Sequence, residues 1–330
     1  MPLFTDRSGR FSPLLTLTLI GLVLPAAWLA ARAANGDFSG PAPAPFGLPP
    51  GFAPQGETPF GPAAGAASAF AGPGGEAARP IYDAIHLTGD WAVRFLLLSL
   101  AVTPFRRLLH WPRLHLVRRR VGLAALAYAA LHLGLYVADQ QFDLLRVAGE
   151  IALRVYLAIG FVALIGLVAL GATSTDAAMR RMGAKRWGRL HKLAYAIAGL
   201  GVLHFAMQSK LDVGEPMLMW GLFVWAMGWR GLQARSGERA VDWRWLLSLA
   251  FMAALATAAS EALWYGLATG VNPWRVLAAN LTPGYGVRPA GWVLLFGLAA
   301  TLSSLVGARR RGPDRPRAPS LTPVAKGGRA

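Results

Sequence analysis

Long apolar runs constrain this chain more than any other feature of its sequence. Such runs recur along most of the 330 residues, and only 15% of the residues are charged, against about 25% in soluble domains. Because lipid supplies no hydrogen-bond partners, each run is predicted to be a helix. At about 20 residues per span, the expected fold class is an all-α integral membrane protein, a polytopic helical bundle of about eight transmembrane helices. The expected spans are 13–31, 88–104, 121–138, 151–171, 191–207, 217–229, 245–267 and 291–306.

Basic residues between the runs predict which way the bundle faces. Segments 106–120 and 180–192 carry six Lys or Arg residues each, segment 230–244 carries four, and the tail from residue 309 carries seven. The intervening loops are much poorer, so the positive-inside rule places both termini in the cytoplasm (N-in/C-in). The net charge of +17 is therefore a topology signal, and no nucleic-acid partner is expected. The first run also has the basic start and small-residue end of a cleaved signal peptide, which would leave seven spans in the same orientation.

Two histidines fall inside predicted spans, where ionisable residues are rare and usually functional. His132 lies 11 residues into its span and His204 lies 13 residues beyond His191, which gives similar depths of about 17 and 20 Å. Two neutral imidazoles facing each other across a helical bundle are suited to axial ligation of a b-type haem. The chain has no cysteine, which excludes covalent haem attachment and iron–sulfur ligation. The alternative is a pair of buried histidines that each bond a backbone carbonyl.

Other polar residues near the spans carry weaker signals. His191, at the mouth of the fifth span, is either a ligand of a second haem or an interfacial histidine. Thirteen residues turn an ideal helix by about 220°, so His191 and His204 share no face unless the helix bends or His191 precedes the regular helix. Arg118 and Arg119 are either topology determinants or partners of haem propionates or a flavin phosphate. Arg94, inside the second span, either snorkels or pairs with Asp90. His86 just outside that span is either an interfacial histidine or a quinol-site or haem-edge group.

Several stretches together resemble one known family. These are IHLTGDWAVRFLLLSLAVTPFRRL, WPRLHLVRRRVGLAALAYAALHLGLY, and the run from TST through RLHKLAY to VLHF. The chain resembles the MsrQ family, the haem-binding membrane subunits of protein-methionine-sulfoxide reductase systems, within the ferric-reductase-like transmembrane group. The resemblance implies one or two b-type haems, with His132, His191 and His204 at the family's ligand positions. It also favours retention of the first span.

The sequence departs from the family pattern in three places. Segment 35–80 lengthens the first outer loop, and the last two spans are additional to the usual six. The wider group has a second histidine about 14 residues before the one that matches His132, but this chain has Arg118 there. The ligand opposite His191 therefore stays open among Arg118, His115 or no residue.

The resemblance also implies a function and a division of the chain. It implies an electron conduit in the bacterial inner membrane, an electron-transfer subunit of an oxidoreductase. Electrons would come from a cytoplasmic flavin reductase or the quinone pool, with FMN as a further carrier, and pass to the periplasmic molybdopterin subunit MsrP. The expected parts are a first helix (1–34), a Pro/Gly/Ala-rich periplasmic linker (35–80), a haem-binding core (81–232), a two-helix extension (233–307) and a basic disordered cytoplasmic tail (308–330).

Two other functions fit the residues alone. One is a free-standing quinol- or ferric-reducing b-type cytochrome. The other is a membrane transporter or assembly protein whose histidines are structural. The sequence contains no nucleotide-binding glycine motif that follows a strand. In either redox function, electrons are therefore expected from a separate protein or from a quinol.

Overall fold

The computed structural model describes residues 12–35, 57–58, 61–62, 80–209, 212–237, 239–282 and 286–310. Two short strands, β1 (Glu57–Thr58) and β2 (Gly61–Pro62), pair antiparallel. The rest of the expected linker 35–80 and the expected tail beyond Arg310 lie outside the described residues. The helices are α1 (Pro13–Asn35), α3 (Pro80–Leu108), α4 (His115–Asp139), α5 (Leu144–Leu153), α6 (Val155–Ala172), α7 (Asp176–His191), α8 (Leu193–Ser209), α9 (Gly214–Ser236), α10 (Trp243–Thr269), α11 (Pro273–Ala279) and α12 (Pro289–Arg310), with a 3₁₀ turn η1 (Pro112–Leu114) before α4.

The helices confirm a polytopic helical membrane protein. In the described part of the chain, seven helical segments are long and apolar enough to cross a membrane, with α7 and α8 counted as one. The remaining expected span, 217–229, corresponds to α9, which is long enough at 23 residues but is not among the seven. Its sequence includes Glu215, Arg230 and Arg235, which lower its hydropathy.

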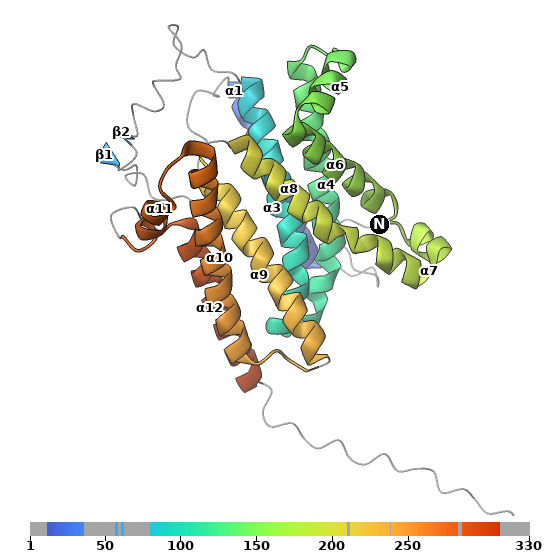
Figure 1. Cartoon of the computed structure of the whole chain (residues 1–330). Coiled ribbons are helices and arrows are strands. Elements are labelled where there is room, and N and C mark those ends of the chain that lie inside the picture. The colour runs from blue at the N-terminus through green and yellow to red at the C-terminus, as the bar shows by residue number, and fades with distance from the viewer. Residues whose placement is uncertain are drawn as a thin grey trace, which may run out of the picture.

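Helix α3 lies at the centre of the bundle and contacts α1, α4, α8, α9 and α12 (Figure 1). One core forms where α3, α4, α6 and α8 meet, around buried residues such as Phe95, Leu100 and Ala125. A second core surrounds Trp225 and Trp229 of α9, which pack against α10 and α12. Helix α9 therefore joins the first core to the C-terminal helices.

Pro104 does not end the second span, and the expected limits at residues 88 and 104 are wrong. Helix α3 begins at Pro80 and continues past Pro104 to Leu108. Proline has no N–H, so the carbonyl of Leu100 loses its usual donor four residues later. Arg230 of α9 supplies that donor, because its Nη2 lies 2.6 Å from the Leu100 oxygen. A side chain of a neighbouring helix thus satisfies the carbonyl and allows the helix to continue.

A side chain also enters the backbone of the first helix, next to a second proline. Pro25 lies inside α1. The hydroxyl of Tyr128, on α4, donates to the carbonyl of Leu22 at 2.9 Å and accepts the N–H of Ala26 at 2.9 Å. The hydroxyl is therefore inserted between two backbone groups that are four residues apart. This contact packs α1 against α4.

Two further helix boundaries differ from the expected ones. The span expected over 151–171 starts at Val155, because Arg154 is extended (φ −107°, ψ 109°) and separates α5 from α6. The span expected from His191 starts at Leu193, and His191 is the last residue of α7. His191 therefore precedes the regular helix that carries His204.

The bond between Arg230 and Leu100 predicts a coupled effect on stability. We expect Arg230→Met to lower the free energy of unfolding by about 1–3 kcal/mol, because the Leu100 carbonyl then lacks a donor. In a Pro104→Ala background the restored N–H at position 104 donates to Leu100, so the same change costs less. Denaturant unfolding in detergent, followed by circular dichroism, measures both costs. Arg235→Met, at an exposed position of α9, is the control, and equal costs in both backgrounds would contradict the prediction.

Candidate functional site

A cavity of about 280 Å³ lies among α3, α4, α6 and α8, just below the usual range of about 300–1,000 Å³ for small-molecule pockets. Its walls are mostly apolar, with Val93, Leu96 and Leu164 among them. His132 of α4 and His204 of α8 both line it. An apolar cavity with a few converging polar groups is the usual form of a cofactor site.

The structure brings His132 and His204 together, as the matched depths predict. Their ring centres lie 6.2 Å apart and their planes are nearly perpendicular, at 82°. Two imidazoles on opposite sides of one metal, with metal–nitrogen bonds of about 2 Å, have ring centres roughly 6 Å apart. The observed spacing therefore fits two axial ligands of one metal.

Helix α3 holds the His132 ring by a carbonyl and a glycine. The Nδ1 atom of His132 lies 2.7 Å from the carbonyl oxygen of Ile85. A Cβ atom placed on Gly89, one turn further along α3, would lie 3.0 Å from the His132 ring. The absence of a side chain at Gly89 therefore provides the space that the ring occupies.

Helix α6 holds the His204 ring by the same arrangement. The Nδ1 atom of His204 lies 2.7 Å from the carbonyl oxygen of Tyr156. A Cβ atom on Gly160, again four residues after the carbonyl, would lie 2.8 Å from the ring. Each histidine thus lies against a glycine of a neighbouring helix and bonds the carbonyl one turn before it.

These hydrogen bonds determine which nitrogen of each histidine is available to a ligand. A carbonyl oxygen only accepts, so Nδ1 of His132 and of His204 must carry the proton. The lone pair is then on Nε2, which is the state of a neutral histidine that binds a metal. The alternative expected from the sequence, a carbonyl bond to each buried histidine, is present, but it leaves one nitrogen of each ring available.

The number of protein ligands points to a particular kind of metal group. No cluster of three or more His, Cys, Asp or Glu side chains that could hold a metal ion occurs among the described residues. A bare ion would therefore be poorly coordinated at the His132–His204 pair. A haem brings its own macrocyclic ligands and needs only the axial ones from the protein. The residues present fit a haem.

His191 lies in different surroundings. Its ring stacks on Trp187 with centres 3.8 Å apart. Its Nδ1 lies 3.1 Å from the carbonyl oxygen of Trp187, and its Nε2 lies 3.4 Å from the hydroxyl of Ser174. Among the ring contacts and hydrogen bonds of the described residues, none joins His191 to another histidine. The structure does not bring His191 to the His132–His204 pair.

Arg118 and Arg119 lie at the start of α4, and neither lines the cavity. The Nη1 atom of Arg119 forms an ion pair with Asp176 Oδ1 at 2.9 Å, which joins α4 to α7. Arg118 is near enough to His191 to affect it electrostatically. Arg118 therefore belongs to the surroundings of His191, whereas Arg119 is held at the start of α7 by Asp176.

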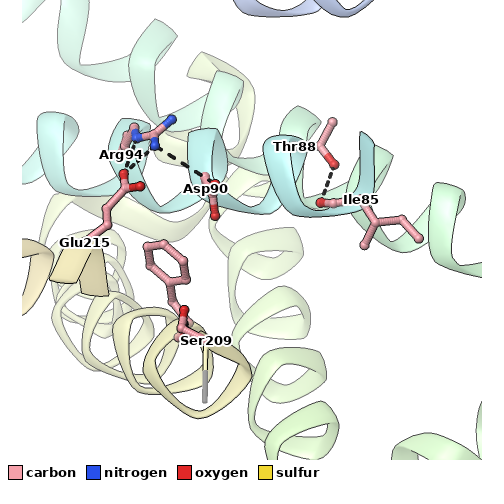
Figure 2. A network of polar contacts seen from close by, with 7 residues as sticks. Ile85, Thr88, Asp90, Arg94, Ser209 and Glu215 are labelled. Carbon is pink, nitrogen blue, oxygen red and sulfur yellow. Dashed lines mark hydrogen bonds and ion pairs between the residues drawn. The ribbon is translucent and has the colours of Figure 1, made fainter. Parts of the chain in front are cut away.

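Other cavity residues were not singled out as site residues in the sequence. Gly89 and Gly160 could not be recognised as site residues from the sequence, because glycine is common inside transmembrane helices. Asp90 lines the cavity and was expected only as a partner of Arg94. Figure 2 shows Arg94 between Asp90 and Glu215, and its Nε lies 2.7 Å from Glu215 Oε1. Glu215 belongs to α9, 121 residues away along the chain, and sequence spacing could not pair these residues.

Comparisons with known proteins identify the family of the chain. Residues 88–202 match the family described as "Ferric reductase like transmembrane component". That range contains His132 and His191 and ends two residues before His204. No solved structure matches this chain.

Several curated relatives carry the name "Protein-methionine-sulfoxide reductase heme-binding subunit MsrQ". The protein from Polaromonas naphthalenivorans is 43% identical over 156 residues, which are 46% of this chain and 71% of the relative. The one from Caulobacter vibrioides is 42% identical over 48% of this chain and 76% of its own length. The one from Rhodospirillum rubrum is 44% identical over 44% of this chain and 70% of its own length. This identity, over more than two thirds of each relative, shows that the chain belongs to the MsrQ family of haem-binding membrane subunits.

Proposed function

We propose that the chain binds a b-type haem between His132 and His204 and conducts electrons across the bacterial inner membrane. The electrons would pass to a periplasmic molybdopterin subunit, MsrP, that reduces methionine sulfoxide in oxidised proteins. The observation that carries the proposal is the paired arrangement of the two histidines. Each imidazole has one nitrogen held by a carbonyl and one left for a metal, and their ring centres are 6.2 Å apart.

The chain's own residues position the ligands before any metal binds. The carbonyls of Ile85 and Tyr156 hold the proton on Nδ1 and orient the rings. Such contacts to the outer nitrogen raise the basicity of the metal-binding nitrogen. The apolar cavity walls keep water from the pair, which lowers the local dielectric constant. A bound haem supplies reversible one-electron redox chemistry at this depth.

His191 is proposed as the ligand of a second haem on the resemblance alone. To bind a metal, Nε2 of His191 would give up its weak 3.4 Å contact with the hydroxyl of Ser174. Arg118 and Arg119 lie in the same region and would neutralise haem propionates or an FMN phosphate. The opposite ligand is not identified among the described residues, so the first haem has the stronger support.

The donor and the division of the chain are also proposals. The donor would be a cytoplasmic flavin reductase or the membrane quinone pool, because no nucleotide-binding motif is present. The haem-binding core would be residues 81–232, and residues 233–307 would be an extension. That extension begins after α9 and contains α10, α11 and α12. It contacts the core mainly through α9.

Haem content measured on single-histidine variants tests the ligand assignment. We expect His132→Ala and His204→Ala each to lose the haem of this pair, because one of the two imidazoles that would hold it is removed. His191→Ala is expected to keep it. Purified full-length chain in detergent would be analysed by absorption spectroscopy and haem-to-protein stoichiometry. A full haem content in either of the first two variants would refute the pairing, and no haem band in the wild type would refute every redox function.

The two glycines provide a second, independent test. Gly89→Ala and Gly160→Ala are expected to weaken haem retention about 10- to 100-fold, the range for substitutions that disturb the support of a metal ligand. The added methyl group would occupy the space of each ring. Gly134→Ala on α4 is the matched control, because a Cβ there meets nothing within 4 Å. Haem loss to an apo-haem acceptor measures retention, and equal retention in all three variants would show that the glycines are not needed.

The electron-conduit function is tested by reoxidation. Chemically reduced chain in vesicles is expected to be reoxidised by a partner MsrP together with methionine sulfoxide, and not by either component alone. The absorbance change on reoxidation measures the rate. Reoxidation by ferric chelates but not by MsrP with methionine sulfoxide would instead favour a free-standing ferric-reducing cytochrome.

A further inference from the structure

One face of α3 carries polar side chains from the outer end of the helix to the depth of the histidine pair. Tyr82, His86 and Asp90 follow each other at four-residue intervals and all line the cavity. Residues four apart lie on one face of a helix, one above the other. The rings of Tyr82 and His86 are 4.4 Å apart. Asp90 is the innermost member of the row and directly follows Gly89, against which the His132 ring lies.

The Asp90 carboxylate lies inside a membrane helix but has few partners that would stabilise its negative charge. Its side chain is 22% exposed, and its closest cation is Arg94, with an Nη2–Oδ2 distance of 4.0 Å. That distance is too long for a hydrogen bond. No hydrogen bond to the Asp90 side chain is found among the described residues, whereas Asp143 and Asp242, which cap helices outside the bundle interior, each accept one. An intramembrane carboxylate in this position is usually functional.

Arg94 forms its ion pair with a different carboxylate, that of Glu215. Its Nε donates to Glu215 Oε1 at 2.7 Å, and its Nη2 also donates to that oxygen. The guanidinium carbon lies 4.9 Å from the centre of the Trp91 ring. Figure 2 shows Glu215 beside the guanidinium and Asp90 further away. The cluster therefore holds two carboxylates for one guanidinium, and it reaches charge balance when Asp90 carries a proton.

We propose that Asp90 is a proton-binding residue coupled to the redox state of the site, which takes up one proton from the outer side for each electron that enters. This inference rests on the proposed haem at His132 and His204. An electron added at low dielectric constant favours a compensating positive charge nearby. With a haem bound at the pair, one electron from the flavin or quinol donor would reduce it from the ferric to the ferrous state, and one proton from water would form the O–H bond of the Asp90 carboxyl. On reoxidation the electron leaves for the acceptor and the proton returns to water.

The row on α3 provides the route for that proton. His86 lies one turn outside Asp90, and Tyr82 lies one turn further out, where its side chain is 49% exposed. Imidazole and phenol groups both donate and accept protons. The end of α3 that bears Tyr82 is the end expected to face the periplasm, where reduction of a sulfoxide to a thioether and water consumes protons.

Several other charged and titratable groups surround Asp90 or line the same cavity. On α3 they are His86 and Arg94, and on α9 it is Glu215. The remaining walls contribute His132, Tyr136 and Asp139 of α4, Tyr156 of α6 with Arg154 before it, and His204 of α8. Of the two other carboxylates, Asp139 is exposed and Glu215 is bound to Arg94. Asp90 is the carboxylate that combines enclosure with a weak partner.

The experiment measures the haem midpoint potential against pH by optical redox titration of full-length chain in detergent. In the wild type we expect the potential to fall as pH rises, by up to about 59 mV per pH unit for one proton per electron. Asp90→Asn is expected to show a potential that is independent of pH and close to the wild-type value at low pH, since the amide resembles the protonated acid. Asp139→Asn, at an exposed carboxylate of the same cavity, is the control and is expected to keep the wild-type slope.

Two further measurements keep the test decisive if Asp90→Asn binds no haem. Glu215→Gln releases Arg94 to pair with Asp90, so the pH range of the slope is expected to move to lower pH. Redox-difference infrared spectra of the wild type are expected to contain the carbonyl band of a carboxylic acid that appears on reduction. A wild-type potential independent of pH, or a slope retained in Asp90→Asn, would overturn the proposal. So would an unshifted slope in Glu215→Gln together with no such band. A haem-free wild type would instead overturn the proposed function itself.

Discussion

Backbone carbonyl oxygens inside this bundle accept hydrogen bonds from side chains of neighbouring helices, in a medium where lipid supplies no donors. Arg230 donates to Leu100, and the Tyr128 hydroxyl donates to Leu22. The same kind of bond, from an imidazole N–H to a helix carbonyl, holds each histidine of the cavity. In a medium that cannot replace a lost partner, each such bond orients the helix or the ring that makes it. The packing of the bundle and the geometry of its site thus depend on the same physical requirement.

The position of α9 follows from that requirement. Two of its polar residues bind α3: Glu215 forms the ion pair with Arg94, and Arg230 donates to Leu100. Its large apolar residues, Trp225 and Trp229, are buried against α10 and α12. A helix whose charges are paired inside the bundle does not need the hydropathy of one that faces lipid. This explains why α9 is the least obvious span by composition and yet lies in the middle of the molecule.

Much of the architecture was predictable because hydropathy and charge act locally. Each expected span is found as a helix, and the membrane class is confirmed, since neither conclusion depends on contacts between segments. Two of the expected helix boundaries were wrong for different reasons. Pro104 was expected to end a helix and does not, because Arg230, 126 positions later in the sequence, replaces the missing donor. The expected start of α6 was wrong because the backbone of Arg154 is extended, which separates residues 151–153 from the helix that begins at Val155.

By itself the sequence determined the class of protein, the approximate depth of His132 and His204, and the family to which they point. These follow from the length of apolar runs, from residue counting along helices, and from local motifs. Only the tertiary structure decided that the two rings lie 6.2 Å apart, that Gly89 and Gly160 make room for them, and that His191 is not their neighbour. The reason is geometric: helical periodicity specifies which residues share a face, whereas the rotation and approach of each helix depend on the side chains of others.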